Sequence, residues 1–397
     1  MRDFVYFTPT KVLFGAEAEC RTGAVLQSYG CKKVLIHYGG KSALANGLLN
    51  RIIRSVADAG IAYAVLGGVV PNPRLSKVTE GIALCRREQV DFILAVGGGS
   101  VIDSAKAIAY GLAATCDVWD FFSGKAQPQG SFPVGCVLTI AAAGSEMSNS
   151  CVITNDSNGL KRACDNEFGR CRFAIMNPSL TLTLPQYQTQ CGCADILMHT
   201  MERYFHRGGT LELTDALSEA LMKSVMRYAR VLLSEPDNLQ ARAEIMWAGS
   251  LSHNGLTGCG GGNGDWATHL IEHELGGMFD VAHGAGLTAV WGSWARYVCG
   301  AAPARFVRFA TEVMDVDATG QSEEAVIEAG ISAMEAFFAE IGMPTSLEAL
   351  GLSRVDDSVI EVLSAQCTDN GQKQIGDVLP LNAQDVKKIY SAALKSR

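Results

Sequence analysis

The sequence predicts an α/β domain followed by an all-α domain. The chain has 397 residues, a length that suggests two domains rather than one. Its first half alternates short apolar runs with helical patterns, which is typical of a parallel sheet with helices on both faces. After Pro185 the β-branched runs disappear and long helical periods replace them. We therefore expect an α/β domain over residues 1–185 and a helical domain over residues 186–397.

The first half contains the elements of such a sheet in chain order. Buried strands are expected at Lys33–Tyr38, Ile61–Leu66, Asp91–Val96, Val134–Ile140, Cys151–Thr154 and Arg172–Met176. Helices are expected at Ser42–Ala59 and Leu75–Glu88. In the second half the helical periods cover Ala194–His206, Leu213–Leu233, Leu239–Asn254, Asp265–Met278, Ser322–Ile341 and Asp385–Lys395.

Composition excludes several classes of protein. Hydrophobic residues make up 48% and charged residues 19% of the chain, the balance of a globular protein with a large core. The net charge of -8 does not favour nucleic acid or anionic membranes. No apolar stretch is long enough to span a membrane, and the N-terminus does not resemble a signal peptide, so we expect a cytoplasmic protein. The 13 cysteines include no CxxC pair, and we expect reduced, buried thiols, with any redox role of Cys191 and Cys193 left open.

A glycine-rich turn follows the strand at Asp91–Val96. Gly97, Gly98 and Gly99 let a ligand approach the backbone closely, and the helix that follows offers free N–H groups to a pyrophosphate. Ser100 is the expected N-cap, with Asp103 in a position resembling a capping box. The pattern is not GxGxxG, so a plain strand-to-helix turn remains the alternative. We expect these residues to bind a dinucleotide.

The end of the second strand suggests which dinucleotide. An acid is usual there in NAD-binding proteins, because it accepts hydrogen bonds from the ribose hydroxyls. This chain has Gly39-Gly40-Lys41-Ser42 instead, with an ammonium and a hydroxyl that suit a 2′-phosphate. An ordinary surface lysine is the alternative explanation of Lys41. The loop favours NADP(H) over NAD(H).

Three of the seven histidines fall into a pattern with one acid. Asp195 and His199 are four residues apart and share one face of a predicted helix. His269 lies on a later helix, and His283 opens another one. Hydrogen-bonded core histidines are common, but one carboxylate and three imidazoles from three helices also suit a divalent metal. Spacing does not choose among Fe(II), Zn(II), Co(II) and Mn(II).

Taken together, the motifs resemble those of the iron-containing alcohol dehydrogenases, in the right order and over essentially the whole chain. The segments that carry the resemblance are Gly97–Asp103, Gly144–Glu146, Asp195–His199, Asp265–Leu275 and Ala282–Leu287. Asp265–Leu275 is most similar to the butanol dehydrogenase and aldehyde reductase branch. The resemblance implies a Rossmann-like domain plus a helical domain, a dehydroquinate synthase-like fold, with the active site in the cleft between them.

The resemblance also implies roles for individual residues. Asp195, His199, His269 and His283 would bind one ion, Fe(II) or Zn(II). The cofactor would contact Asn72, Thr139, Ser148 and Lys161 besides the two glycine-containing segments. His273, one helical turn after His269, would relay the proton or hold the nicotinamide ribose, unless it only orients the metal ligands. The usual threonine pair is here Thr139-Ile140, which puts single phosphate contacts in doubt.

The function expected is interconversion of small primary alcohols and aldehydes by hydride transfer with NAD(P)(H). A metal acting as a Lewis acid makes the alcohol proton easier to remove, and the cofactor supplies the hydride chemistry. A polyol dehydrogenase of the same fold is the main alternative. A metal-dependent hydrolase would not need the dinucleotide segment, and a dehydroquinate synthase would need clustered cations. We expect a homodimer that binds no nucleic acid or membrane.

Overall fold

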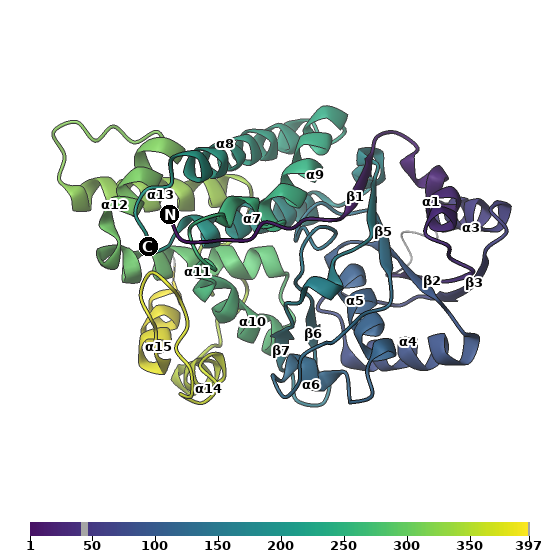
Figure 1. Cartoon of the computed structure of the whole chain (residues 1–397). Helices are drawn as coiled ribbons and strands as arrows, with labels where there is room; N and C mark the ends of the chain where they lie inside the picture. Colours follow the sequence, from purple (N-terminus) through teal and green to yellow (C-terminus); the bar gives the residue numbers. More distant parts are fainter. Residues whose placement is uncertain (41–46, 396–397) are drawn as a thin grey trace. The chain divides into compact units, whose positions relative to one another are not determined.

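The computed structural model describes residues 1–40 and 47–395, and these fall into two compact units (Figure 1). Residues 7–184 form one of them, the α/β unit. The other, the helical unit, begins at Pro185 and also includes the first six residues of the chain. Within it, the backbone N–H of Arg2 donates to the carbonyl of Gly260 at 2.9 Å.

The α/β unit is built on a six-stranded sheet with the order β1-β8-β5-β4-β2-β3, in which all neighbours are parallel. Its strands are β1 (Lys11–Phe14), β2 (Lys33–Tyr38), β3 (Ala62–Leu66), β4 (Phe92–Gly97), β5 (Val134–Leu138) and β8 (Phe173–Met176). The strand order reverses between β2 and β4. In open sheets of this kind ligands bind beyond the carboxyl ends of the strands at that point.

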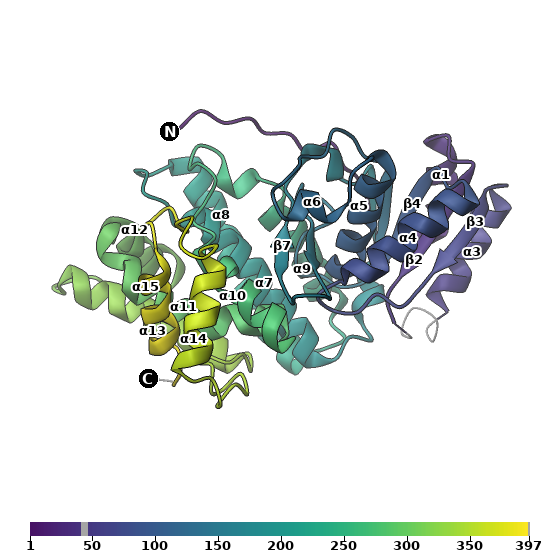
Figure 2. The ribbon, with the colours of Figure 1, turned by 90° about the horizontal axis from the view of Figure 1, so that it is seen from below.

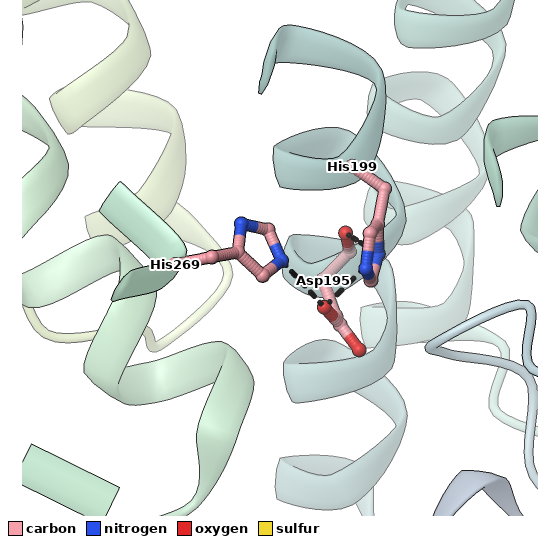
Figure 3. A group of neighbouring side chains, drawn as sticks. All are labelled: Asp195, His199 and His269. Atoms are coloured by element: carbon pink, nitrogen blue, oxygen red, sulfur yellow. Dashed lines mark hydrogen bonds and ion pairs between the residues drawn. The ribbon is translucent and has the colours of Figure 1, made fainter. Parts of the chain in front are cut away.

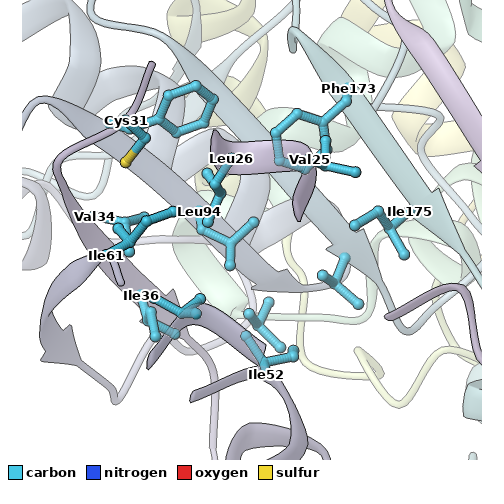
Figure 4. Close-up of a cluster of buried hydrophobic side chains, with 14 of the residues drawn as sticks. Val25, Leu26, Cys31, Val34, Ile36, Ile52, Ile61, Leu94, Phe173 and Ile175 are labelled. Atoms are coloured by element: carbon cyan, nitrogen blue, oxygen red, sulfur yellow. The ribbon is translucent and has the colours of Figure 1, made fainter. Parts of the chain in front are cut away.

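Helices cover both faces of this sheet. One pair is α1 (Thr22–Ser28) with α3 (Leu48–Asp58), and the other is α4 (Leu75–Glu88) with α5 (Gly99–Ala113), as Figures 1 and 2 show. Ile36 of β2 belongs to the apolar core beneath α1 and α3 (Figure 4). The next residue, His37, lies 2.9 Å from the hydroxyl of Ser104 on α5. Because successive side chains of a strand alternate between faces, the two pairs cover opposite faces.

Two predictions in this unit need correction. The segment at Cys151–Thr154 does not join the parallel sheet, because β6 (Val152–Thr154) pairs antiparallel with β7 (Lys161–Ala163) in a separate ladder. The helix predicted at Ser42–Ala59 is described only from Leu48 onward, as α3, and residues 41–46 lie outside the described residues. The short α6 (Trp119–Phe122) was not predicted.

The helical unit consists of α7 (Gln186–Tyr204), α8 (Glu212–Ser234), α9 (Leu239–His253), α10 (Ala267–Phe279), α11 (His283–Val298), α12 (Pro303–Arg308), α13 (Glu323–Glu340), α14 (Asp357–Cys367) and α15 (Ala383–Ala392). α11 packs against both α7 and α10. The predicted combination of a parallel α/β part and a helical part is confirmed. Over residues 1–40 and 47–395, none of the helices has both the length and the apolar character needed to cross a membrane.

Candidate metal and cofactor sites

Helix α7 brings Asp195 and His199 together at the centre of the helical unit. The two residues are four apart on one face, and both are buried, with 4% and 3% of their surface exposed. His199 Nδ1 lies 3.0 Å from the carbonyl oxygen of Asp195 and 3.2 Å from its Oδ1 (Figure 3). This arrangement leaves Nε2 as the nitrogen that is not engaged with α7.

Helix α10 adds His269 to the pair. Its Nε2 lies 3.9 Å from Asp195 Oδ1, and ligating atoms of Asp195, His199 and His269 all lie within 4.8 Å of one another (Figure 3). On the other side of the ring, Nδ1 lies 2.8 Å from Oε1 of Glu202. His269 Nε2 is buried and has no hydrogen-bond partner among the described residues. Such a nitrogen is expected to have a ligand.

Helix α11 begins at His283, as predicted, and brings this ring to the same acid. His283 Nε2 lies 3.7 Å from Asp195 Oδ1, while Nδ1 forms a short hydrogen bond with Glu272. A Cβ on Gly284 would lie 2.1 Å from the backbone oxygen of Cys191, so glycine is needed for the close packing of α11 on α7. The four predicted ligands therefore converge from three helices.

The electrostatics of this cluster fit a divalent cation. Asp195, Glu202 and Glu272 are three buried carboxylates, and buried charges are normally paired or coordinate a metal. Burial, followed by the nearby histidines, holds the pKa of His199 well below its ordinary value. A neutral imidazole keeps the lone pair that a metal needs. The oxygen and nitrogen donor set suits Fe(II) or Zn(II).

Other groups around this cluster escaped the sequence analysis. Glu202 and Glu272 each follow one of the candidate ligand histidines by three residues, but their partners lie on other helices, so the spacing alone does not reveal their contacts. His253, at the end of α9, stacks on His199 with 4.0 Å between ring centroids. His273, which the sequence analysis did name, is 7% exposed, and its ring centroid lies 5.8 Å from that of His283. Ligating atoms of Glu272, His273 and His283 also lie within 4.8 Å of one another.

In the α/β unit the glycine-rich turn joins β4 to α5, as predicted, but its cap differs. α5 begins at Gly99, and Gly98 is the N-cap, so the prediction of Ser100 as the N-cap is wrong. A Cβ on Gly98 would lie 3.0 Å from the Cβ of Ile140. Glycine is therefore needed at this position partly because the loop after β5 packs closely against it.

Two predicted cofactor residues already have partners inside the α/β unit. The carboxylate of Asp103 accepts hydrogen bonds from Ser145 Oγ at 2.5 Å and from Val152 N at 3.0 Å. The fully buried Lys106 ammonium donates to the carbonyl of Ser148 at 3.0 Å and to that of Ser150 at 2.8 Å. These bonds fasten the loop after β5 onto α5.

The other predicted cofactor residues are spread along the unit. Gly39 follows β2, and Thr139 follows β5, where its N–H donates to the carbonyl of Gly97 at 3.1 Å. Asn72 has a left-handed backbone with φ of 52°. Lys161 opens β7 with a buried side chain, and Gly40 is exposed. Lys41 and Ser42 lie outside the described residues.

The α/β unit has a strand-to-helix glycine turn, and the helical unit has a cluster of acid and imidazole groups. A dehydrogenase that depends on a metal and a dinucleotide requires both. Comparison with known proteins defines the class further. The model of the iron-containing alcohol dehydrogenase family matches residues 9–178, and the model of the C-terminal part of that family matches residues 189–394. The chain belongs to the iron-containing alcohol dehydrogenase family.

Relatives of known name match the chain over nearly its full length. A probable NADH-dependent butanol dehydrogenase of Bacillus subtilis is 36% identical, covering 99% of this chain and 100% of the relative. The NADPH-dependent aldehyde reductase YqhD of Escherichia coli is 33% identical with the same coverage. The crystal structure of NADH-dependent butanol dehydrogenase A from Thermotoga maritima is similar at a TM-score of 0.95 and 35% identity, covering 100% of this chain and 99% of that one.

Family membership confirms the expected class of reaction. The chain is a nicotinamide-dependent oxidoreductase that interconverts alcohols and aldehydes by hydride transfer. The alternative of a metal-dependent hydrolase is excluded, and a polyol dehydrogenase receives less support from the relatives. The residues that hold the metal and the cofactor are the subject of the proposals that follow.

Proposed function

We propose that Asp195, His199, His269 and His283 hold one divalent ion, with Fe(II) as the native metal and Zn(II) as the alternative. The observation that carries the proposal is that ligating atoms of Asp195, His199 and His269 lie within 4.8 Å of one another, with His283 Nε2 3.7 Å from Asp195 Oδ1. When bound, the ion supplies Lewis-acid chemistry toward the substrate oxygen. The three imidazoles and the single carboxylate would hold it between α7, α10 and α11 of the helical unit.

The substrates are small primary alcohols and the corresponding aldehydes, a class supported by relatives named as butanol dehydrogenases and an aldehyde reductase. The experiment follows NAD(P)H at 340 nm with short-chain aldehydes, using wild-type protein that has been stripped by a chelator and then reloaded with Fe(II) or Zn(II). The stripped protein should be inactive, and Fe(II) should restore the most activity. Full activity after exhaustive chelation would refute the proposal.

His273 is proposed to carry the proton that the reaction exchanges with solvent. Its buried ring lies close to His283 and Glu272, so a ring nitrogen has groups nearby that accept and return a proton. His273→Asn should lower kcat and flatten its pH profile while the ion stays bound. A variant with wild-type kcat and pH profile would leave His273 as a residue that only supports its neighbours.

For the cofactor we propose a preference for NADP(H). The support is the Gly39-Gly40-Lys41-Ser42 segment after β2, which has no acid to hold a ribose hydroxyl or repel a phosphate. The contacts proposed for the dinucleotide are those of the glycine turn, Asn72, Thr139 and Lys161. Relatives named for NADH and for NADPH both occur, so the family accommodates either choice. Equal kcat/KM values for NADPH and NADH would refute the preference.

A homodimer in the cytoplasm is the remaining proposal about this enzyme. The cytoplasmic location is consistent with the composition of a globular protein with a moderate acidic charge, whereas composition does not determine the number of chains. Light scattering of the purified full-length chain measures the mass directly. A mass of one chain across the micromolar range would refute the dimer.

A further inference from the structure

The sequence His-x-x-Glu occurs twice in the helices of the proposed metal site. His199-Thr200-Met201-Glu202 lies on α7, and His269-Leu270-Ile271-Glu272 lies on α10. Three residues along a helix place the acid next to the histidine but one turn further on. In each case the acid contacts a proposed ligand histidine of another helix rather than the one on its own helix.

Glu202 of α7 reaches across to α10. Its Oε1 accepts two hydrogen bonds from one residue, His269: the backbone N–H at 3.0 Å and ring Nδ1 at 2.8 Å. α10 begins after Trp266, which provides no side-chain cap, so Glu202 also satisfies one of the N–H groups exposed at the start of that helix. A single carboxylate thus fixes both the helix start and the ring it carries.

Glu272 of α10 repeats the arrangement toward α11. Its side chain is fully buried and accepts a short hydrogen bond from Nδ1 of His283. Room for it depends on Gly286 of α11, since a Cβ there would lie 2.8 Å from Cγ of Glu272. His199 differs, because its Nδ1 faces Asp195 of its own helix, the backbone oxygen at 3.0 Å and Oδ1 at 3.2 Å.

We infer that Glu202 and Glu272 are positioning residues for the metal, an inference that rests on the ligand set proposed above. A neutral imidazole has one N–H and one lone pair. A carboxylate that accepts the proton at Nδ1 places the lone pair on Nε2, and it makes that nitrogen a stronger donor. In both residues it is Nε2 that points to Asp195, at 3.9 Å for His269 and 3.7 Å for His283. Each acid therefore sets the tautomer and direction of one metal ligand.

The test measures metal affinity, with no reliance on turnover. Metal-free full-length protein competes with a chromophoric chelator for Zn(II), in the wild type and in Glu202→Ala, Glu202→Gln, Glu272→Ala and Glu272→Gln. The alanine variants should bind one Zn(II) per chain about 10- to 100-fold more weakly. The glutamine variants keep an acceptor oxygen but lose the charge, so a loss of about fivefold is expected.

Two further measurements separate positioning from a general structural role. The absorption bands of bound Co(II) should shift in the Glu202 and Glu272 variants, because they report the arrangement of the ligands. Glu335→Gln is the matched control, since Glu335 pairs with Arg296 in the same unit at 2.7 Å and should leave affinity and spectrum unchanged. If the alanine variants do not fold, the isosteric glutamine variants decide the question.

The outcomes distinguish this inference from the proposed ligand set. Wild-type affinity and Co(II) spectra in all the Glu202 and Glu272 variants would overturn the positioning role alone. Retention of stoichiometric, wild-type Zn(II) binding by His269→Ala would overturn the ligand set, and the positioning role with it. Weakened binding in the glutamate variants, together with loss of the bound ion in His269→Ala, would support both.

Discussion

The same residue type is used in two ways in the two units of this enzyme. In the α/β unit, both ring nitrogens of His37 are satisfied by protein groups, the carbonyl of Leu66 at 3.0 Å and Ser104 Oγ at 2.9 Å. In the helical unit, His269 has one nitrogen on Glu202, and its other nitrogen is buried with no hydrogen-bond partner among residues 1–40 and 47–395. Burial does not separate the core histidine His37 from the proposed metal ligand His269, because both are buried; the partners of the two ring nitrogens do.

The largest effect is expected where a proposed metal ligand is removed. His199→Ala should lose the bound ion and lower kcat by about 10³-fold or more, because Lewis-acid stabilisation of charge in the transition state is worth several kcal/mol. Dinucleotide affinity should be unchanged, since the proposed cofactor residues lie in the α/β unit. Metal analysis, kcat and dinucleotide titration check this together. A variant without metal but with near-normal kcat would show that the histidines of the helical unit do not act through a metal.

In the α/β unit, the corresponding test of His37 measures how the free energy of unfolding depends on pH. Burial lowers the pKa of His37 from 6.5 to about 4. The folded state therefore binds fewer protons than the unfolded state, so stability is complete above pH 6.5 and is lost as the pH falls toward 4. The loss is about 3 kcal/mol for a shift of this size.

Urea unfolding between pH 4 and 7 measures this effect in the wild type and in His37→Asn. The variant should be less stable at pH 7, but the difference between the two proteins should shrink as the pH falls. Its Zn(II) content should be that of the wild type. A stability difference that stays constant with pH would show that His37 does not take up the proton.

How far the sequence predicts each site follows from what the site is made of. Asp195 and His199 are four residues apart on one helix, so spacing predicts that they share a face. The grouping of this pair with His269 and His283, on two other helices, could be anticipated only from the resemblance to the family. The role of Glu202 could not, because its partner belongs to another helix and only packing brings the two together. In the α/β unit, Asp103 and Ser148 are predicted to contact the cofactor, yet their bonds fasten a loop after β5 that no periodicity describes.

The fold shows the same division. β2 and α4 have the predicted ends, because a buried strand and a fourteen-residue helix carry clear periodicity. The three-residue β6 was assigned to the wrong sheet, and β1, with four residues, was not predicted. Short elements carry too few residues to define a period, so their pairing depends on contacts distant in sequence.

A smaller effect is expected from a change in the packing of α11 against α7, because this packing places His283. In Gly284→Ala the new methyl group would meet the backbone oxygen of Cys191 at 2.1 Å, so α11 must move away from α7 and carry His283 with it. A cost of about 1–3 kcal/mol is expected, together with weaker Zn(II) binding. Gly300→Ala is the control, since a Cβ there meets nothing within 4 Å. Equal melting temperatures and Zn(II) affinities for the two variants would contradict this account.

The smallest effect concerns the cofactor, where the site is largely backbone and a side chain must be added to test it. A Cβ on Gly39 meets only ordinary contacts, with Val101 Cγ2 and the carbonyl of Val69 both at 3.5 Å, so a larger residue fits there. Gly39→Asp should accept a hydrogen bond from a ribose hydroxyl and repel a 2′-phosphate. Gly39→Asn has the same size without the charge.

A partly exposed phosphate contact is worth about 1–2 kcal/mol, so we expect a ten- to thirtyfold preference for NADPH in the wild type. The aspartate variant should reverse this preference, and the asparagine variant should change it little. The measurement is kcat/KM with NADPH and NADH for all three proteins. If both variants shift the ratio equally, the loop after β2 selects by size and not by charge.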